Sequence, residues 1–120
     1  MRATHLVGFV SIAIAIGLVG AIVASSMEMG IVGGIASIVS TRWGVTTLID
    51  AYIGLVIAGA WIASLERRAR TGAIWFIALM LTGNLATLAY VAMRAFRART
   101  VREIFIASLS ERAPDRNVHR

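Results

Sequence analysis

The fold is decided by the stretch LVGFVSIAIAIGLVGAIVASSM, Leu6 to Met27, which has 22 residues and no charge. Two later runs share its character: Val45 to Leu65 has 21 residues with one acid, and Thr71 to Met93 has 23 residues with none. At about 1.5 Å rise per residue, each run makes a helix of about 30 Å, the thickness of the hydrocarbon core of a bilayer. The sequence therefore predicts an all-α membrane protein with three transmembrane helices, at 6–27, 45–65 and 71–93.

The composition agrees with a membrane protein. Hydrophobic residues make up 58% of the 120 residues and the mean hydropathy is +0.81, which is more apolar side chain than a small soluble domain can bury. The chain has no cysteine, which excludes disulfide scaffolds and thiolate catalysis. His5 and His119 lie at opposite ends of the chain, so we expect no metal site and no cofactor. We expect the chain in the bacterial cytoplasmic (inner) membrane.

All 12 basic residues are arginine, and the formal net charge is +6. The arginines form blocks beside the apolar runs, which is typical of membrane flanks rather than of a nucleic-acid-binding face. The arginines that we expect among lipid headgroups are Arg67, Arg68, Arg70, Arg97, Arg99 and Arg102. The aromatic residues that we expect to anchor the helices at the interfaces are Trp43, Trp61 and Trp75.

Two alternatives concern the number of spans. The glycine-rich segment Met29 to Thr41 has 13 residues and reaches only about 20 Å as a helix, so it is predicted to be a short interfacial or re-entrant segment. With three spans the arginines divide almost equally between the two sides, whereas a fourth crossing at 29–41 would give a clear positive-inside bias. We favour three spans on length.

The first run also resembles a signal peptide, but it is longer than usual and is predicted to be a retained anchor.

Residues 1–93 are thus predicted to form the transmembrane bundle, and residues 94–120 a basic amphipathic helix and tail on the cytoplasmic side. Thr100-Val101-Arg102-Glu103 has the form of a capping box, which marks a helix start. Apolar residues recur at three- and four-residue steps from there to Leu109, and Pro114 ends the pattern. Such a helix lies on lipid headgroups or docks on a partner subunit.

Asp50 is the acid within the second run, and acids at that depth normally face protein or water. If the second and third runs form an antiparallel hairpin of straight helices, Tyr90 lies at the depth of Asp50 and Arg94 about one turn beyond. We therefore predict an Asp50–Tyr90 hydrogen bond or an Asp50–Arg94 ion pair, with Asn84 close by. The alternative is that Asp50 titrates as a proton or cation site. The small residues predicted to allow close helix packing are Gly17, Gly20, Gly54, Ala58 and Gly83.

The segment Thr47 to Gly54 (TLIDAYIG), followed by Trp61, Trp75 and the segment Gly83 to Tyr90 (GNLATLAY), carries a resemblance. In their order and spacing these motifs resemble a family of short bacterial multi-span membrane proteins described as a domain of unknown function. The resemblance covers residues 43–90. It implies a small three-span bundle and brings no activity, cofactor or binding role with it.

No catalytic constellation is recognisable, so we expect a non-enzymatic protein. Three helices cannot bury all their small-residue faces among themselves, so the leading prediction is an accessory or structural subunit that packs against a larger membrane complex or against itself. One alternative is a small oligomeric proton, cation or solute transporter or channel that uses Asp50. The other is a protein that binds anionic lipid through residues 94–112.

Overall fold

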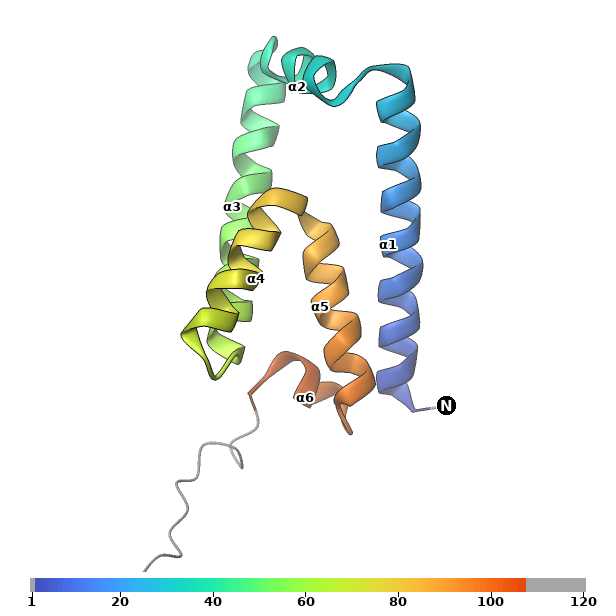
Figure 1. Ribbon diagram of the computed structural model, residues 1–120, viewed down its shortest axis with the longest axis vertical. Helices are drawn as coiled ribbons and strands as arrows, with labels where there is room; N and C mark the ends of the chain where they lie inside the picture. The colour runs from blue at the N-terminus through green and yellow to red at the C-terminus, as the bar shows by residue number, and fades with distance from the viewer. Residues whose placement is uncertain (1, 108–120) are drawn as a thin grey trace, which may run out of the picture.

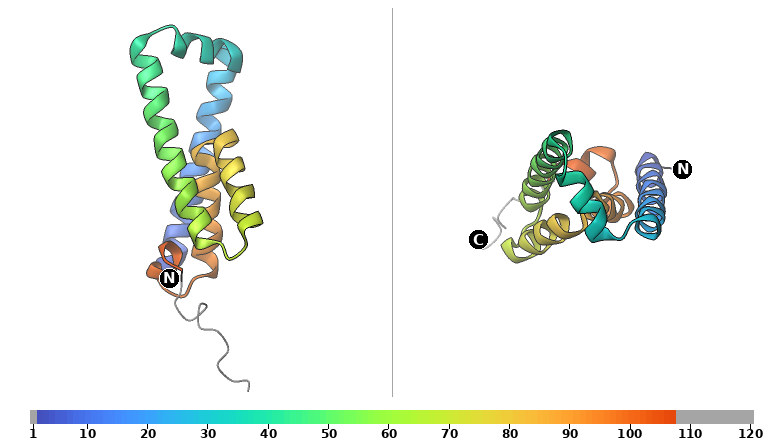
Figure 2. Two further views of the ribbon diagram at one scale, coloured as in Figure 1. Left: turned by 90° about the vertical axis from the view of Figure 1, so that its left-hand side faces the viewer. Right: turned by 90° about the horizontal axis from the view of Figure 1, so that it is seen from above.

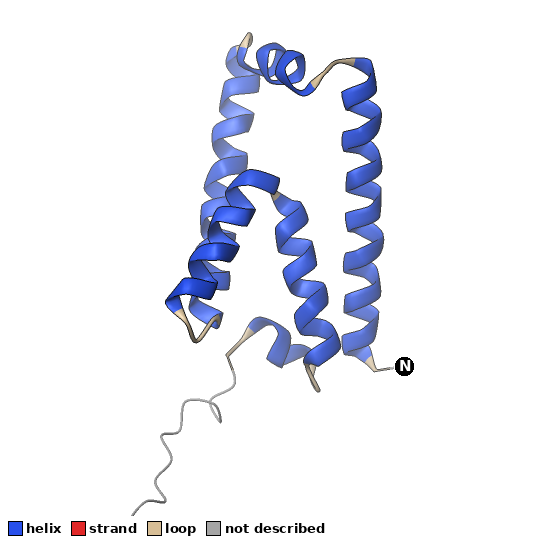
Figure 3. Cartoon of the chain, in the orientation of Figure 1, coloured by secondary structure: helices blue, strands red, loops and turns tan. Residues whose placement is uncertain are grey.

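The computed structural model describes residues 2–107, and all regular structure in this range is helical (Figures 1 and 3). The helices are α1 (Ala3–Glu28), α2 (Ile31–Val39), α3 (Arg42–Leu65), α4 (Ala69–Thr82), α5 (Asn84–Arg97) and α6 (Val101–Phe105). The prediction of an all-α fold is confirmed.

The two longest helices, α1 and α3, correspond to the first two apolar runs. Among the described residues, only these two helices are both long enough and apolar enough to cross a membrane, judged by length and composition. They run antiparallel, and α2 connects them across one end of the molecule (Figure 1). The glycine-rich segment between the first two runs therefore forms a short helix.

The prediction of a third long helix is wrong, because the third run is interrupted at Gly83. This glycine has φ 64° and ψ −145°, a backbone conformation that residues with a side chain rarely adopt. The Gly83 amide donates to the Leu79 carbonyl at 2.8 Å, which is the last hydrogen bond of α4. The Gly83 carbonyl accepts from the Ala86 amide at the start of α5. The chain reverses there, so α4 and α5 form a hairpin of two 14-residue helices (Figure 1).

The hairpin lies beside the two long helices at the end away from α2, with α5 between α1 and α3 (Figures 1 and 2). Helix α4 packs on α3 and α5 packs on α1. Glycines permit both approaches: a Cβ atom at Gly59 of α3 would come within 2.5 Å of the Phe76 ring, and one at Gly8 of α1 within 2.8 Å of the Phe96 ring. On α4, Gly72 lies directly against Ala63.

The core cluster lies where α3, α4 and α5 meet, and consists of Leu55, Ile62, Leu79, Ala86 and Tyr90. Beyond the tip of the hairpin, α1 and α3 continue without touching each other. Large apolar side chains are exposed along most of α1 and along the half of α3 nearest α2. Within the described chain, the hairpin thus packs on the long helices only at the end away from α2.

Helix α6 begins where the capping box predicted. The Thr100 hydroxyl accepts from the Glu103 amide at 3.4 Å, and a Glu103 carboxylate oxygen accepts from the Arg99 amide at 2.8 Å. The helix ends at Phe105, because Ile106 is extended, so the predicted continuation toward Leu109 is wrong at Ile106 and Ala107. The rest of that predicted helix and the tail, 108–120, lie outside the described residues.

Candidate functional site

Four segments that are distant in sequence meet at one end of the molecule. They are the start of α1, the turn between α3 and α4, the end of α5, and α6 (Figure 1). This end, called here the basic end, carries every arginine of the described chain except Arg42. The expectation that residues 67–70 and 94–102 lie on opposite sides is wrong, because the reversal at Gly83 brings the end of α5 back to the side on which α4 began.

A hydrogen bond joins α5 to the end of α3 at the basic end. The Tyr90 hydroxyl donates to Glu66 Oε1 at 2.6 Å, and Tyr90 is fully buried. Glu66 is the residue that follows the last turn of α3. The buried phenol therefore has its polar atom satisfied, and the carboxylate gains a charge-assisted bond.

Side chains from α3 and α5 hold the carbonyl groups at the end of α6. Arg94 donates from Nη2 to the Glu103 carbonyl at 2.6 Å and from Nε to the Ile104 carbonyl at 2.8 Å. The Trp61 indole donates to the Phe105 carbonyl at 3.1 Å. The last carbonyls of a helix have no partner within it, and a cation there also interacts favourably with the helix dipole. Arg94 and Trp61 thus cap α6 and fix it to the bundle.

Aromatic rings surround these hydrogen bonds. The Tyr90 ring lies edge to face with Trp75 at 5.0 Å and with Trp61 at 6.2 Å between centroids. Trp61 also stacks on Phe105 of α6 at 6.0 Å. We call the side chains of Trp61, Glu66, Tyr90 and Arg94, together with the three carbonyls of residues 103–105, the base cluster. Its hydrogen bonds join the ends of α3, α5 and α6 to one another.

The predicted pairing of Asp50 is not formed. Tyr90 donates to Glu66, and Arg94 donates to the α6 carbonyls. The side chain of Asp50 is exposed and makes no hydrogen bond within residues 2–107. The prediction that Tyr90 lies at the depth of Asp50 required two straight helices of full length. Since the chain reverses at Gly83, Tyr90 lies on a helix that runs back toward the basic end, and it meets Glu66 at the end of α3.

The other residues singled out by the sequence are dispersed. Ala58 packs against the core cluster and Gly83 forms the turn of the hairpin, where Asn84 is exposed at the start of α5. A Cβ atom at Gly17, Gly20 or Gly54 would meet no other atom within 4 Å, so these three glycines face open space in the described chain. Trp43 is 83% exposed at the start of α3, whereas Trp61 and Trp75 belong to the aromatic group around Tyr90.

Glu66 was not predicted as the partner of Tyr90, and Gly8, Gly59 and Gly72 were not predicted as packing glycines. Glu66 looked like a turn residue, since it directly follows an apolar run. A signal was nevertheless present in the spacing around the turn. Gly59 and Trp61 lie 7 and 5 residues before Glu66, and Trp75 and Phe76 lie 7 and 8 residues after Arg68.

Replacing Arg94 by alanine should release α6. Three hydrogen bonds to Tyr90 and to two α6 carbonyls are lost, and at roughly 1 kcal/mol each they would change a local equilibrium by about tenfold or more. Trypsin cleavage after Arg99 and Arg102, measured by mass spectrometry, should therefore be at least about tenfold faster in Arg94→Ala than in the wild type. The control is Arg70→Ala, an exposed arginine of α4. Equal rates in the two variants would contradict the capping role.

Comparison with known proteins gives one match. The family model described as "Protein of unknown function (DUF1475)" matches residues 3–112, which is nearly the whole chain. No curated protein and no solved structure matches the chain.

Proposed function

Since the chain belongs to the family of unknown function DUF1475, membership supplies no activity, and we propose from the structure that it is a non-enzymatic integral protein of the cytoplasmic membrane. In this proposal α1 and α3 span the bilayer, α4 and α5 form a re-entrant hairpin, and the basic end faces the cytoplasm. The protein serves as an accessory subunit that packs against another membrane protein.

The observation that carries the membrane assignment is the exposure of the two long helices. In their most apolar windows only 11% of the α1 residues and 17% of the α3 residues are buried inside the protein. The core helix of a soluble protein would be mostly buried. Each square ångström of apolar surface left in water costs roughly 25 cal/mol, so lipid is the solvent that fits this surface.

The length of the hairpin supports a re-entrant arrangement. Helices α4 and α5 have 14 residues each, which gives about 21 Å against about 30 Å of hydrocarbon. Backbone polar groups at membrane depth must be satisfied within the protein, and at the turn the Gly83 amide donates to the Leu79 carbonyl while the Gly83 carbonyl accepts from the Ala86 amide. The hairpin therefore enters and leaves on the same side.

The distribution of arginine supports the orientation. The basic end carries Arg2, Arg67, Arg68, Arg70, Arg94, Arg97, Arg99 and Arg102, whereas the opposite end carries Arg42. An excess of arginine of this size marks the cytoplasmic side. Six of these arginines, in the turn before α4, in the first turn of α4, at the end of α5 and around α6, are the ones expected among lipid headgroups, and all six are exposed.

The accessory role is supported by the unfilled half of the bundle. Next to α2, the two long helices have no contact with each other and expose apolar side chains and open glycines. Within a membrane, helices associate through close packing and interhelical polar contacts. The polar groups of the base cluster are all used to join helix ends, so the free surface is the remaining region for interaction.

The topology can be tested by cysteine labelling, because the natural chain has no cysteine. Single-cysteine variants Ser40→Cys, Arg68→Cys and Arg99→Cys are treated in intact spheroplasts with a maleimide that cannot cross the membrane. We expect Ser40→Cys to be labelled at once, and the other two to be labelled only after permeabilisation. Ile16→Cys, in the middle of α1, should remain unlabelled in both conditions and become reactive in detergent.

The pattern distinguishes the possible topologies. Three spans would place positions 68 and 99 on opposite sides, and four would place positions 40 and 99 on one side opposite position 68. Labelling of all four variants without permeabilisation would contradict a membrane location. The accessory role is tested by purification in mild detergent, where a stoichiometric partner of different sequence is expected and a lone monomer would contradict it.

A further inference from the structure

Asp50 is the charged residue in the middle of α3, and it does not belong to the base cluster. Its side chain is exposed and makes no hydrogen bond to any described residue. It lies seven residues after Trp43 and eleven before Trp61, that is, about 10 Å and 16 Å along the helix. In the proposed topology this position is inside the hydrocarbon core, and the short side chain of aspartate cannot reach either interface. A carboxylate at such a depth requires a polar or charged partner.

The surroundings of Asp50 have the geometry of a helix-docking face. Asp50, Ile53, Gly54 and Ile57 follow the spacing i, i+3, i+4, i+7 and so share one side of α3. Ile53 is 56% exposed and Ile57 is 65% exposed, and the Cβ position of Gly54 is open. Glycine at such a position lets the backbone of another helix approach closely. These four residues are called here the Asp50 face.

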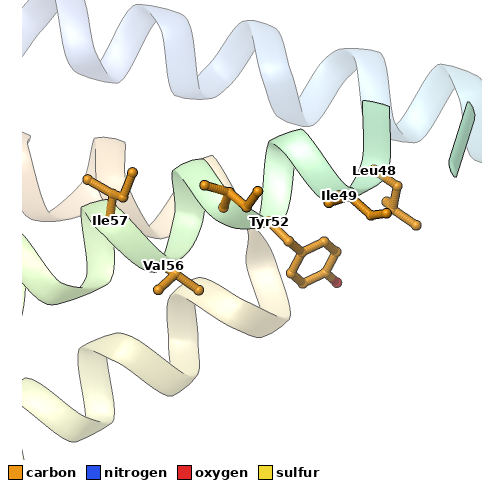
Figure 4. Close-up of a pocket in the computed structure, with 6 residues that line it drawn as sticks. Leu48, Ile49, Tyr52, Val56 and Ile57 are labelled. Carbon is orange, nitrogen blue, oxygen red and sulfur yellow. The ribbon is translucent and has the colours of Figure 1, made fainter. Parts of the chain in front are cut away.

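A shallow hollow of about 440 Å³ adjoins the Asp50 face (Figure 4). It is lined by apolar side chains and by Tyr52, and it shares Ile53 and Ile57 with the face; the lining residues are Leu48, Ile49, Tyr52, Ile53, Val56 and Ile57. A hollow of this kind can receive the apolar side chains of a neighbouring helix. The face therefore combines an unpaired charge, a small residue and an apolar depression.

We propose that the Asp50 face docks a transmembrane helix of a different protein, and that this helix carries a basic side chain opposite Asp50. The inference rests on the proposed membrane topology. Charge complementarity selects the partner, because lipid tails offer no cation and an apolar helix would leave the carboxylate unpaired. An interhelical ion pair at this depth specifies both the partner and its register.

A second copy of this chain does not meet the requirement. A copy in the same orientation carries its nearest basic residue on α3 at Arg42, eight residues and about 12 Å from the depth of Asp50. Its other described arginines lie at the basic end, opposite the end of the molecule at which α2 lies. Among its described residues a second copy therefore has no cation at the depth of Asp50, and we assign the cation to a different sequence.

The test uses the full-length protein and synthetic leucine-rich transmembrane peptides as probes, reconstituted in phosphatidylcholine vesicles. The peptides are identical except at one position, at the depth of Asp50, which holds Lys, Leu or Asp. We expect fluorescence transfer to show association of the wild type with the Lys peptide that exceeds association with the Leu peptide by about 3- to 30-fold. Asp50→Asn should lose this preference, and Asp50→Lys should instead prefer the Asp peptide.

Crosslinking locates the contact. A cysteine in the Lys peptide should form a disulfide with Ile57→Cys and not with the matched control Ile77→Cys, a similarly exposed isoleucine of α4 (65% for Ile57 and 58% for Ile77). Equal binding of the Lys and Leu peptides, an unchanged preference in Asp50→Asn, or equal crosslinking at both cysteines would each overturn the inference. Self-association that is lost in Asp50→Asn would overturn it in favour of a homo-oligomer. Because the labelling of positions 40, 68 and 99 is independent, a failure here is distinguishable from a failure of the topology.

Discussion

Replacement of Gly83 by alanine should lower the free energy of unfolding by about 1–3 kcal/mol, because a side chain is forced into a sparsely populated backbone conformation. The φ of 64° with ψ −145° is what turns the chain between α4 and α5. Unfolding can be followed by circular dichroism as sodium dodecyl sulfate is added to the protein in mild detergent. Gly20→Ala is the control, since Gly20 lies inside α1 with open space around its Cβ position, and it should be neutral or slightly stabilising.

The same substitution should also affect topology. Alanine favours a continuous helix from α4 into α5, and such a helix would be long enough to cross the bilayer. In the Gly83→Ala, Arg99→Cys variant, a measurable fraction of molecules should therefore be labelled from outside the cell. If Gly83→Ala behaves like Gly20→Ala in both unfolding and labelling, the hairpin does not depend on this glycine.

Among single substitutions, Tyr90→Ala should lower the free energy of unfolding the most. The residue is fully buried and contacts Trp61 and Trp75, and removal of a buried aromatic ring costs about 3–5 kcal/mol. Tyr90→Phe retains the ring but leaves the Glu66 carboxylate without its donor, so we expect a smaller loss of about 1–3 kcal/mol. The two variants thus separate ring packing from the hydrogen bond.

The matched control is Tyr52→Ala, which removes a tyrosine that is 46% exposed and lies outside the core cluster. Its effect on unfolding should remain within about 0.5 kcal/mol. The same detergent titration serves for all three variants. A Tyr90→Phe variant as stable as the wild type would show that the 2.6 Å bond to Glu66 adds nothing to stability.

The long helices were predictable from the sequence and the hairpin was not. Uncharged length fixes α1 and α3 to within a few residues, since Leu6 to Met27 became Ala3–Glu28 and Val45 to Leu65 became Arg42–Leu65. The third run has the same hydropathy as a spanning helix, and hydropathy does not record backbone dihedral angles. Gly83 was noted as a packing residue, but glycine occurs both inside helices and in turns, and its positive φ follows from tertiary packing.

The sequence predicted some residues of the candidate site, but it did not predict their contacts. Tyr90 and Arg94 were singled out, and both belong to the base cluster. Their partners depend on which helix end they face, and that was set by the unforeseen reversal. The capping signal at Thr100 and Glu103 was local, and it marked the start of α6 correctly. Local hydrogen-bond patterns thus survive an error in topology, whereas predictions based on relative depth do not.

The half-length hairpin has a consequence for how the chain is inserted. In the proposed topology the segment that must be translocated is short, about residues 28–42, and its charged residues are Glu28 and Arg42 at its two edges. The arginines on both flanks of the hairpin remain in the compartment where they are synthesised. Only one guanidinium and one carboxylate therefore have to be transferred fully across the membrane, and the membrane potential that retains the other arginines helps to set the final orientation.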